Sequence, residues 1–201
     1  MITAQDKILH VANKLGLTSL KDMQASTGAV YDVDTEISGQ IFSSAARHQN
    51  PSIANVSENQ FEVNEALLVE TIAFYAQTNT GTVYNLQTAY GSNEVLVFDL
   101  IIGNKRVMKD TPVFISGSPY AFANVAQLTT AVGEATVTTY IPRHQVYMEG
   151  TGILIPPQVQ WYVEYRLFNV VTGAVVPVTS SALIGCYLFG TKVNLNFNTT
   201  I

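Results

Sequence analysis

The residues that could carry chemistry are few and lie far apart in this chain of 201 residues. The single cysteine, Cys186, sits in the apolar segment SALIGCYLFG, which is typical of a small buried side chain rather than of a nucleophile. The three histidines, His10, His48 and His144, have no second histidine or cysteine at the spacing of a zinc site. The sequence therefore predicts no metal, no cofactor and no catalytic residue.

The carboxylates give two further candidates for chemistry. The segment DVDTE (32–36) is similar to the opening of a calcium loop, but Ile37 stands where the loop needs glycine and Ser43 where it ends in glutamate. We interpret these acids as helix caps and solvated groups. A glycosidase needs two facing carboxyl groups, and one sequence does not show which carboxylates face each other. The acids weighed for such a pair are Glu62, Glu65, Glu70 and Glu134. The chain is not expected to be an enzyme.

Composition and charge exclude two classes of protein. Only 12% of the residues are charged and the mean hydropathy is +0.19, yet no uncharged apolar run reaches the length of a membrane span. The net charge is −5, and the ten lysines and arginines form no larger cluster than Lys105, Arg106 and Lys109. Because nucleic-acid binding needs a clustered cationic face, we expect no tight contact with DNA or RNA. The N-terminus does not have the pattern of a signal peptide.

Residues 1–65 are predicted to form a helical and loop-rich N-terminal arm. Thr3 and Asp6 form a capping-box pattern ahead of an apolar stripe, and Gly16 is suited to end that helix. A second short helix is expected through Met23, and a third over 35–49 with Asp34 as its cap. The segments 26–32 and 50–60 are expected to be loops. Such short helices need a surface to pack on, which is either this chain's own β-domain or a neighbouring subunit.

Residues 66–201 are predicted to form a β-sandwich domain. Alternating or β-branched segments bounded by turn residues recur about every dozen residues, without a βαβ rhythm. The fold class is therefore mainly β: an antiparallel sandwich of eight to ten strands, of jelly-roll type, preceded by a short helical arm. An immunoglobulin-like sandwich fits the spacing nearly as well. Residues 117–134 are ambiguous, and Ser118 and Pro119 favour a short helix through Leu128. The expected strands are 66–77, 82–90, 94–102, 107–116, 135–141, 144–149, 152–155, 158–168 and 191–198, with a broken strand pair over 172–190.

One predicted strand, 158–168, carries the candidate site. Its core face is expected to hold Val159, Trp161, Val163, Tyr165 and Leu167. Its other face mixes aromatic, arginine and glutamate side chains, a composition typical of protein–protein contacts. The predicted subunit interface comprises Tyr162, Glu164, Arg166 and Phe168 from this face, with Ile8, Val11 and Leu15 from the first helix. The alternative is that Tyr162 and Phe168 pack under the chain's own N-terminal helices, so that both interpretations cover this face.

The N-terminal arm and the segment GILIPPQVQWYVEY (152–165) resemble the jelly-roll capsid and virion proteins of bacteriophages and other icosahedral viruses. The resemblance lies in the order of an apolar strand, two prolines and a long aromatic strand. The chain departs from many coat proteins in lacking a basic arm. The resemblance implies a virion protein, assembled in the host cytoplasm, whose partners are copies of itself and other virion proteins. It also allows a place in a shell above a membrane.

A second hypothesis is a carbohydrate-binding sandwich, such as a lectin or a fibre-tip module, in which aromatic side chains stack on sugars. A third is a secreted adhesin or pilus subunit, which the missing signal pattern disfavours. The aromatic residues weighed for sugar stacking are Tyr31, Tyr84, Tyr90, Tyr120, Tyr147 and Trp161.

Overall fold

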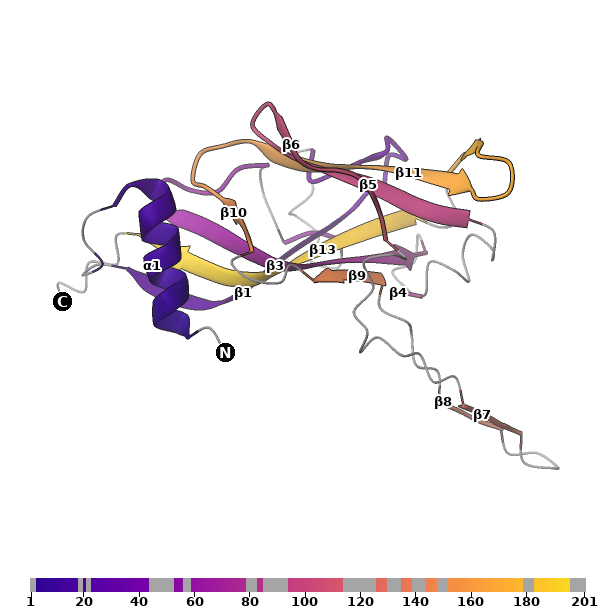
Figure 1. The fold of residues 1–201 in the computed structure, drawn as a ribbon. Helices are drawn as coiled ribbons and strands as arrows, with labels where there is room; N and C mark the ends of the chain where they lie inside the picture. The colour runs from indigo at the N-terminus through magenta and orange to yellow at the C-terminus, as the bar shows by residue number, and fades with distance from the viewer. Residues whose placement is uncertain are drawn as a thin grey trace.

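In the part of the chain that the structure describes, the protein is mainly β, with two large antiparallel sheets, a separate two-stranded sheet and one helix (Figure 1). The computed structural model describes residues 3–17, 20, 23–43, 53–55, 59–78, 83–84, 94–113, 126–129, 135–138, 144–147, 152–178 and 183–195. The two sheets face each other across a common hydrophobic core, as the sequence predicts for a β-sandwich. The strand count and the jelly-roll type remain predictions at this point.

The helix α1 (Ala4–Leu15) begins and ends where the sequence places it. The hydroxyl of Thr3 accepts a hydrogen bond from the Asp6 amide, and the Asp6 carboxylate accepts from the Thr3 amide at 2.9 Å. The Thr3 hydroxyl and the Thr3 amide both donate to the Asp6 carboxylate, and these two bonds lower the pKa of Asp6. Gly16 ends the helix in the left-handed conformation, with φ of 69°. The local capping signals thus fix both ends of α1.

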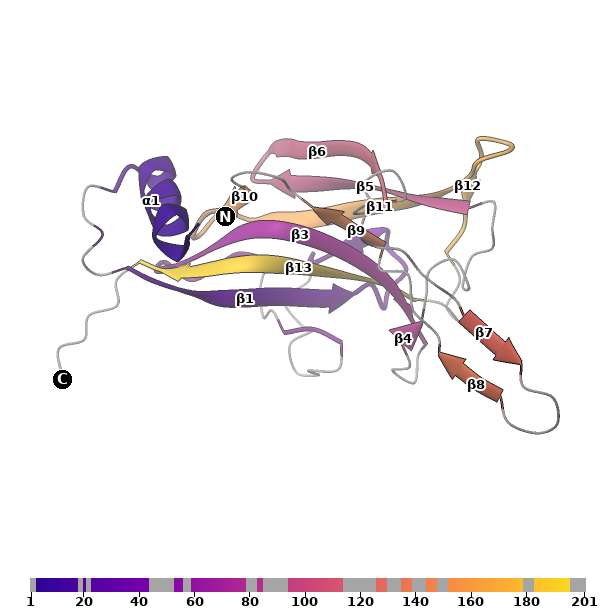
Figure 2. The same ribbon diagram turned by 60° about the horizontal axis from the view of Figure 1, so that its bottom comes forward.

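Sheet A contains the first and last long strands of the chain. Its central order is β1 (Gln24–Val33), β13 (Leu183–Asn194), β3 (Glu65–Gln77) and β10 (Ile153–Ile155), all paired antiparallel. Two further short strands, β4 (Val83–Tyr84) and β9 (His144–Tyr147), also pair with β3. Figure 2 shows β1, β13 and β3 running together along the body of the molecule.

Sheet B is built around β11 (Trp161–Asn169) and β5 (Glu94–Ile102), which pair over nine residues. The strand β6 (Lys105–Pro112) pairs with β5 at one edge. Two short strands, β2 (Gln40–Ile41) and β12 (Val175–Val176), pair with β11. A separate hairpin, β7 (Ala126–Thr129) and β8 (Ala135–Thr138), pairs within itself.

The pairing of the long-range strands is nested along the chain. The first strand, β1, pairs with the last, β13; β2 pairs with β11; β3 pairs with β9 and β10; and β5 pairs with β6. Two additional pairings, β13 with β3 and β11 with β5, join these nested pairs into the two sheets. Strands far apart in sequence are therefore neighbours in space.

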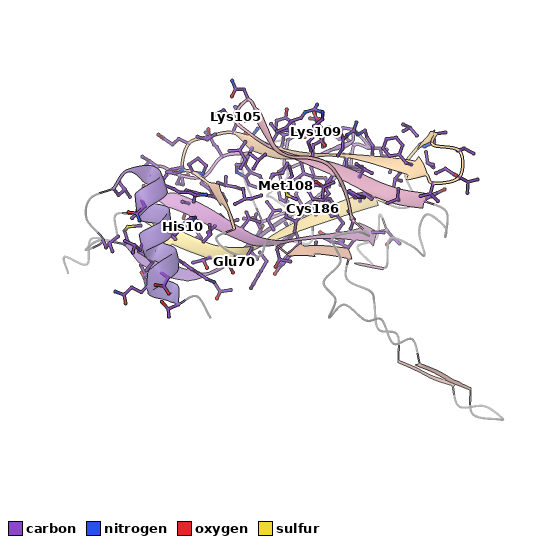
Figure 3. All side chains as sticks on the ribbon, in the orientation of Figure 1. His10, Glu70, Lys105, Met108, Lys109 and Cys186 are labelled. Carbon is purple, nitrogen blue, oxygen red and sulfur yellow. The ribbon has the colours of Figure 1, made fainter. Side chains whose placement is uncertain are left out.

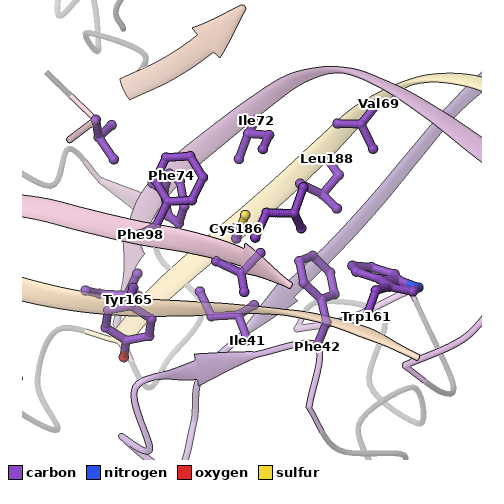
Figure 4. Packing of buried hydrophobic residues seen from close by; sticks show 14 of the residues in the cluster. Ile41, Phe42, Val69, Ile72, Phe74, Phe98, Trp161, Tyr165, Cys186 and Leu188 are labelled. Atoms are coloured by element: carbon purple, nitrogen blue, oxygen red, sulfur yellow. The ribbon is translucent and has the colours of Figure 1, made fainter. Parts of the chain in front are cut away.

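The main core fills the space between the two sheets. Phe74 of sheet A meets Phe98 of sheet B with ring centroids 4.8 Å apart. Trp161 is fully buried, and its ring centroid lies 4.6 Å from that of Phe42 (Figure 4). The ring centroid of Phe61 lies 5.6 Å away. Among the described residues, the indole N–H of Trp161 has no hydrogen-bond partner. The sequence prediction that Trp161 is a core residue is confirmed.

The residues 152–169 form a corner between the sheets. β10 belongs to sheet A and β11 to sheet B, and Pro156-Pro157 lies between them. Proline donates no backbone hydrogen bond, so it is suited to a point where the chain leaves one sheet for the other. The alternation along β11 is also as predicted: Trp161, Val163, Tyr165 and Leu167 are buried, and the residues between them are not.

The strand β3 changes the face of its core residues halfway along. Leu67 and Val69 point into the main core, as do Ile72 and Phe74, so the alternation shifts by one residue between 69 and 72. The pairing with β13 shows the same shift, because Phe189 pairs with Thr71 and Gly190 with Val69. Glu70 is the extra residue of this bulge. The bulge keeps both halves of β3 in the core.

Three predictions for the N-terminal region are wrong where the structure describes it. Residues 24–33, of which 26–32 were expected to be a loop, form β1, because ten residues pair in register with β13. The helix predicted over 35–49 is absent from 35–43, where a turn leads into β2. In sequence, the polar residues around Asp34 resemble a helix cap, but the carboxylate of Asp34 holds a turn instead. Part of the region assigned to the arm therefore belongs to the sheets.

Two further predicted helices lie largely outside the described residues. Met23 and residue 20 are not helical, while 18–19 and 21–22 lie outside the described residues. The helix considered between 117 and 128 also lies mostly outside them, and Ala126–Thr129 at its end is the strand β7.

The bulge at Gly190 generates a stability prediction. A Cβ atom at Gly190 would overlap the carbonyl oxygen of Leu68 in the adjoining strand, so the backbone must shift. We expect Gly190→Ala to lower the free energy of unfolding by about 3 kcal/mol. Gly173→Ala is the matched control, because a Cβ atom at Gly173 would meet no neighbouring atom. Its φ is 69°, so alanine there costs only the strain of the left-handed conformation, about 1 kcal/mol. Equal midpoints for the two variants in urea denaturation would contradict this account of the bulge.

Candidate interaction surfaces

The predicted contact face of β11 lies on the outer side of sheet B. Tyr162, Glu164, Arg166 and Phe168 are partly exposed and alternate with the core residues of the strand. Arg166 lies over the ring of Phe168, with its guanidinium carbon 6.0 Å from the ring centroid. This geometry is typical of a cation–π contact. The aromatic and charged side chains thus share one face, as the sequence predicts; their role in a subunit interface stays a prediction.

A buried carboxylate organises the charges on this face. Asp99 of β5 lies directly opposite Glu164 of β11 in the strand pairing, and only 1% of the Asp99 side chain is exposed. Two carboxylates in directly opposite positions repel each other. Arg106 compensates both, with nitrogens 3.1 Å from Asp99 and 3.3 Å from Glu164. Arg166 adds a second cation, 3.3 Å from Asp99.

The edge strand β6 is shaped around the same carboxylate. Asp99 accepts a hydrogen bond from the amide of Asp110, which has φ of 46°. The β5–β6 register shifts on both sides of Leu100, as expected for bulges in an edge strand. The carboxylate of Asp110 in turn accepts from Arg166 at 2.7 Å. Figure 3 shows Lys105 and Lys109 of β6 along the top of the molecule, with Met108 below them on the core side.

The helix α1 covers the opposite side of the sandwich. Val11 is fully buried with Ala66, Leu68 and Val193, which point away from the main core of sheet A. Leu15 packs against this second cluster, and Ile8 is partly buried. Lys7 forms an ion pair with Glu70, the bulge residue of β3, and donates to Thr191.

The seven predicted interface residues therefore belong to two different surfaces. Ile8, Val11 and Leu15 lie with α1 on sheet A, whereas Tyr162 to Phe168 lie on the outer side of sheet B. Since α1 packs on sheet A, it does not cover Tyr162 or Phe168. The sequence alone could not separate the two surfaces, because nothing local reveals which sheet a helix packs against.

The acids of the DVDTE segment serve the turn between β1 and β2. One oxygen of the buried Asp34 accepts from the Gly39 amide at 2.8 Å and the Tyr165 hydroxyl at 2.9 Å. The other accepts from the Glu36 amide and the Ser38 hydroxyl. Asp32 accepts from the Phe42 amide at 2.6 Å. This pattern anchors a turn to β11, and among the described residues no cluster of metal-binding side chains is found.

The other residues that the sequence offered as candidates for chemistry form no common site among the described residues. Glu65 pairs with Lys192 at 2.8 Å, and Glu70 pairs with Lys7, so these two acids face different cations. His10 lies on α1. The side chain of His144 and residues 48 and 134 lie outside the described part of the chain. Trp161 was considered for sugar stacking, but it is fully buried and has no surface to offer.

A polar cavity of about 220 Å³ lies between β1 and the segment that precedes β3. Lys192 and Glu65 stand in its wall, together with Glu62 and the buried ring of Phe61. Three amide side chains complete the polar lining: Asn55, Gln60 and Gln158. Sequence analysis missed this cavity, because its residues come from five separate parts of the chain.

Comparisons of the chain with family models, with curated proteins and with solved structures found no match. Among the described residues, no helix has both the length and the apolar character needed to cross a bilayer.

The charge cluster generates a second prediction. Replacing both Arg106 and Arg166 by methionine should lower the free energy of unfolding by about 2 kcal/mol, because Asp99 keeps its charge without a cation. Adding Asp99→Asn should recover part of that loss, since a neutral amide needs no cation. Chemical denaturation of the double and triple variants measures both effects. A triple variant no more stable than the double variant would refute the compensation.

The single cysteine generates a third prediction. Cys186 is fully buried, and burial raises the pKa of its thiol, with the nearby Asp32 carboxylate adding to the shift. A raised pKa keeps the thiol protonated as the pH rises through the range in which ordinary thiols ionise. We expect the native protein to resist a disulfide reagent at pH 8.5 and the unfolded protein to react within minutes. Rapid modification of the folded protein would contradict this placement.

Proposed function

We propose that this protein is a jelly-roll structural subunit of a symmetric assembly, a capsid or capsid-associated protein of a bacteriophage or another virus. The observation that carries the proposal is the nested strand pairing. A jelly roll is a long antiparallel ribbon folded over into two sheets, so that its first strand pairs with its last and its second with its last but one. The pairs β1–β13, β2–β11, β3–β10 and β5–β6 follow this scheme.

The two remaining pairings support the same interpretation. Rolling such a ribbon brings its last strand beside its third and its seventh beside its fourth. The eight strands of the ribbon, in chain order, are β1, β2, β3, β5, β6, β10, β11 and β13. The eighth, β13, pairs with the third, β3, and the seventh, β11, pairs with the fourth, β5. An immunoglobulin-like order would not nest the first strand with the last in this way.

The chemistry of the described residues supports a structural rather than a catalytic role. Glu65 and Glu70 each hold a lysine, Asp34 holds a turn, and Cys186 is buried. The partners proposed are copies of this chain and other virion proteins. Tight genome contact is not part of the proposal, because Arg106, from the densest cationic cluster, is held by Asp99 and Glu164. The proposed location is the virion.

The outer face of β11 is the proposed contact between subunits. Its aromatic side chains are only partly covered by their own chain, and Arg166 and Glu164 are held in fixed positions by ion pairs. A rigid face of aromatic and paired charged groups loses little conformational entropy when a partner covers it.

Glycan binding is the second candidate, and the polar cavity beside β1 is the observation that favours it. Its amide and carboxylate side chains are groups that hydrogen-bond sugar hydroxyls. In that case, calorimetry with a glycan panel gives binding to a monomer, and Glu62→Ala abolishes it.

The assembly proposal predicts that purified protein forms regular closed particles by light scattering and electron microscopy. Phe168→Glu should reduce the particle fraction at least about tenfold, since it puts a charge into the contact face, and should leave a folded monomer. Val63→Glu is the control, because Val63 is 59% exposed on the loop before β3. A protein that remains monomeric at high concentration overturns the proposal. An unfolded Phe168→Glu variant, judged by circular dichroism, would instead make this face part of the chain's own core.

A further inference from the structure

The strand β1 forms an edge of sheet A and is unusually regular. All ten of its residues pair with β13 without a register shift. In an antiparallel strand, successive residues direct their backbone groups to alternate sides. The amide and carbonyl of Tyr31 and the carbonyl of Ala29 face away from β13, because Asn55 bonds to them. Ala25 and Thr27 share this parity, so their backbone groups also face outward.

Asn55 closes one half of the edge and leaves the other half open. Its side chain accepts from the Tyr31 amide at 2.7 Å and donates to the Ala29 carbonyl at 2.8 Å, and its own amide donates to the Tyr31 carbonyl at 3.1 Å. These bonds replace those of a neighbouring strand. In the described part of the molecule, nothing bonds to the outward groups of Ala25 and Thr27.

The other edges of the two sheets are protected against pairing with a second chain. β6 has two register shifts, ends at Pro112, and carries the exposed charges of Lys105, Arg106, Lys109 and Asp110. β2, β4 and β12 have only two residues each, and β10 has three. Short strands, bulges, charges and proline are the devices by which edges avoid pairing. The segment QASTG (24–28) has none of them.

We propose that β1 pairs antiparallel with β1 of a second copy of this chain, around a two-fold axis at Ser26. In this register Ala25 of each copy faces Thr27 of the other, and each pair exchanges two backbone hydrogen bonds. The two A sheets then continue into one another. The proposal rests on the proposed function only in taking a second copy of this chain as the partner.

The register follows from which groups are open. Centring the pair on Thr27 would place Ala25 opposite Ala29, whose carbonyl Asn55 already occupies. Centring it on Ala25 would place Thr27 opposite Met23, which lies outside the strand. Only the centre at Ser26 joins the open residues to each other. No charged residue occurs between Gln24 and Tyr31, so the two-fold axis brings no like charges together.

Disulfide cross-linking between two copies of β1 tests this register. The two Ser26 residues form a non-hydrogen-bonded pair, whose Cα atoms lie about 4.5 Å apart, within the range that a disulfide spans. Ser26→Cys should therefore yield a covalent dimer under oxidised glutathione, with the buried Cys186 left intact. Gln24→Cys is the matched control: it faces Gly28 of the partner and lies about 13 Å from its own copy, so it should give at least tenfold less dimer. No dimer from Ser26→Cys, or equal yields, overturns the proposal.

Thr27→Pro provides a second arm. It removes the outward amide of Thr27 and leaves the bonds to β13, since proline is tolerated where the amide faces away from the sheet. We expect the dimer dissociation constant to rise at least about tenfold, because two intersubunit bonds are lost. An unchanged constant in a folded variant overturns the proposal. If particles still form while both arms fail, the edge contact is wrong and the proposed function stands; a protein that stays monomeric refutes both.

Discussion

The architecture depends on burying β3 on both of its faces. One face packs into the core between the sheets through Leu67, Val69, Ile72 and Phe74. The other face, with Ala66 and Leu68, lies under α1 and Val11. Burying an aliphatic side chain of this size is worth roughly 2 kcal/mol, so leaving the outer face bare would forfeit several such contributions. The bulge at Glu70 lets one strand serve both layers, and it supplies the anion that fixes Lys7 of the helix.

The outer faces of the two sheets differ in what covers them. Sheet A hides apolar side chains under a helix of the same chain. Sheet B instead exposes a mixed face, in which the buried Asp99 holds Arg106 and Arg166 in place. Both solutions leave the sandwich interior apolar, yet only sheet B presents a patterned surface of rings and paired charges. That difference is why the outer face of sheet B, and not α1, carries the proposed contact between subunits.

The sequence predicted the features that depend on residues close together in the chain. Thr3, Asp6 and Gly16 bracket α1, and the period-two pattern from Trp161 to Leu167 identifies the core face of β11, because caps and alternation act over a few residues. Non-local features were missed: the first part of β1 has weak strand propensity, with Ala25, Gly28 and Ala29 in it, and it becomes a strand because β13 pairs with it. Asp34 has the sequence of a helix cap, but Tyr165, 131 residues further along the chain, makes it a turn anchor.

The position of β13 in the middle of sheet A has a consequence for synthesis. The ribosome adds roughly 5–20 residues per second, so on the order of ten seconds separate the completion of β3 from that of β13. During that interval neither β1 nor β3 has the strand that finally lies between them. Until β13 emerges, the nascent chain therefore carries strand edges of β1 and β3 that lack their final partner. The emergence of β13, rather than that of any earlier segment, sets the moment at which sheet A can close.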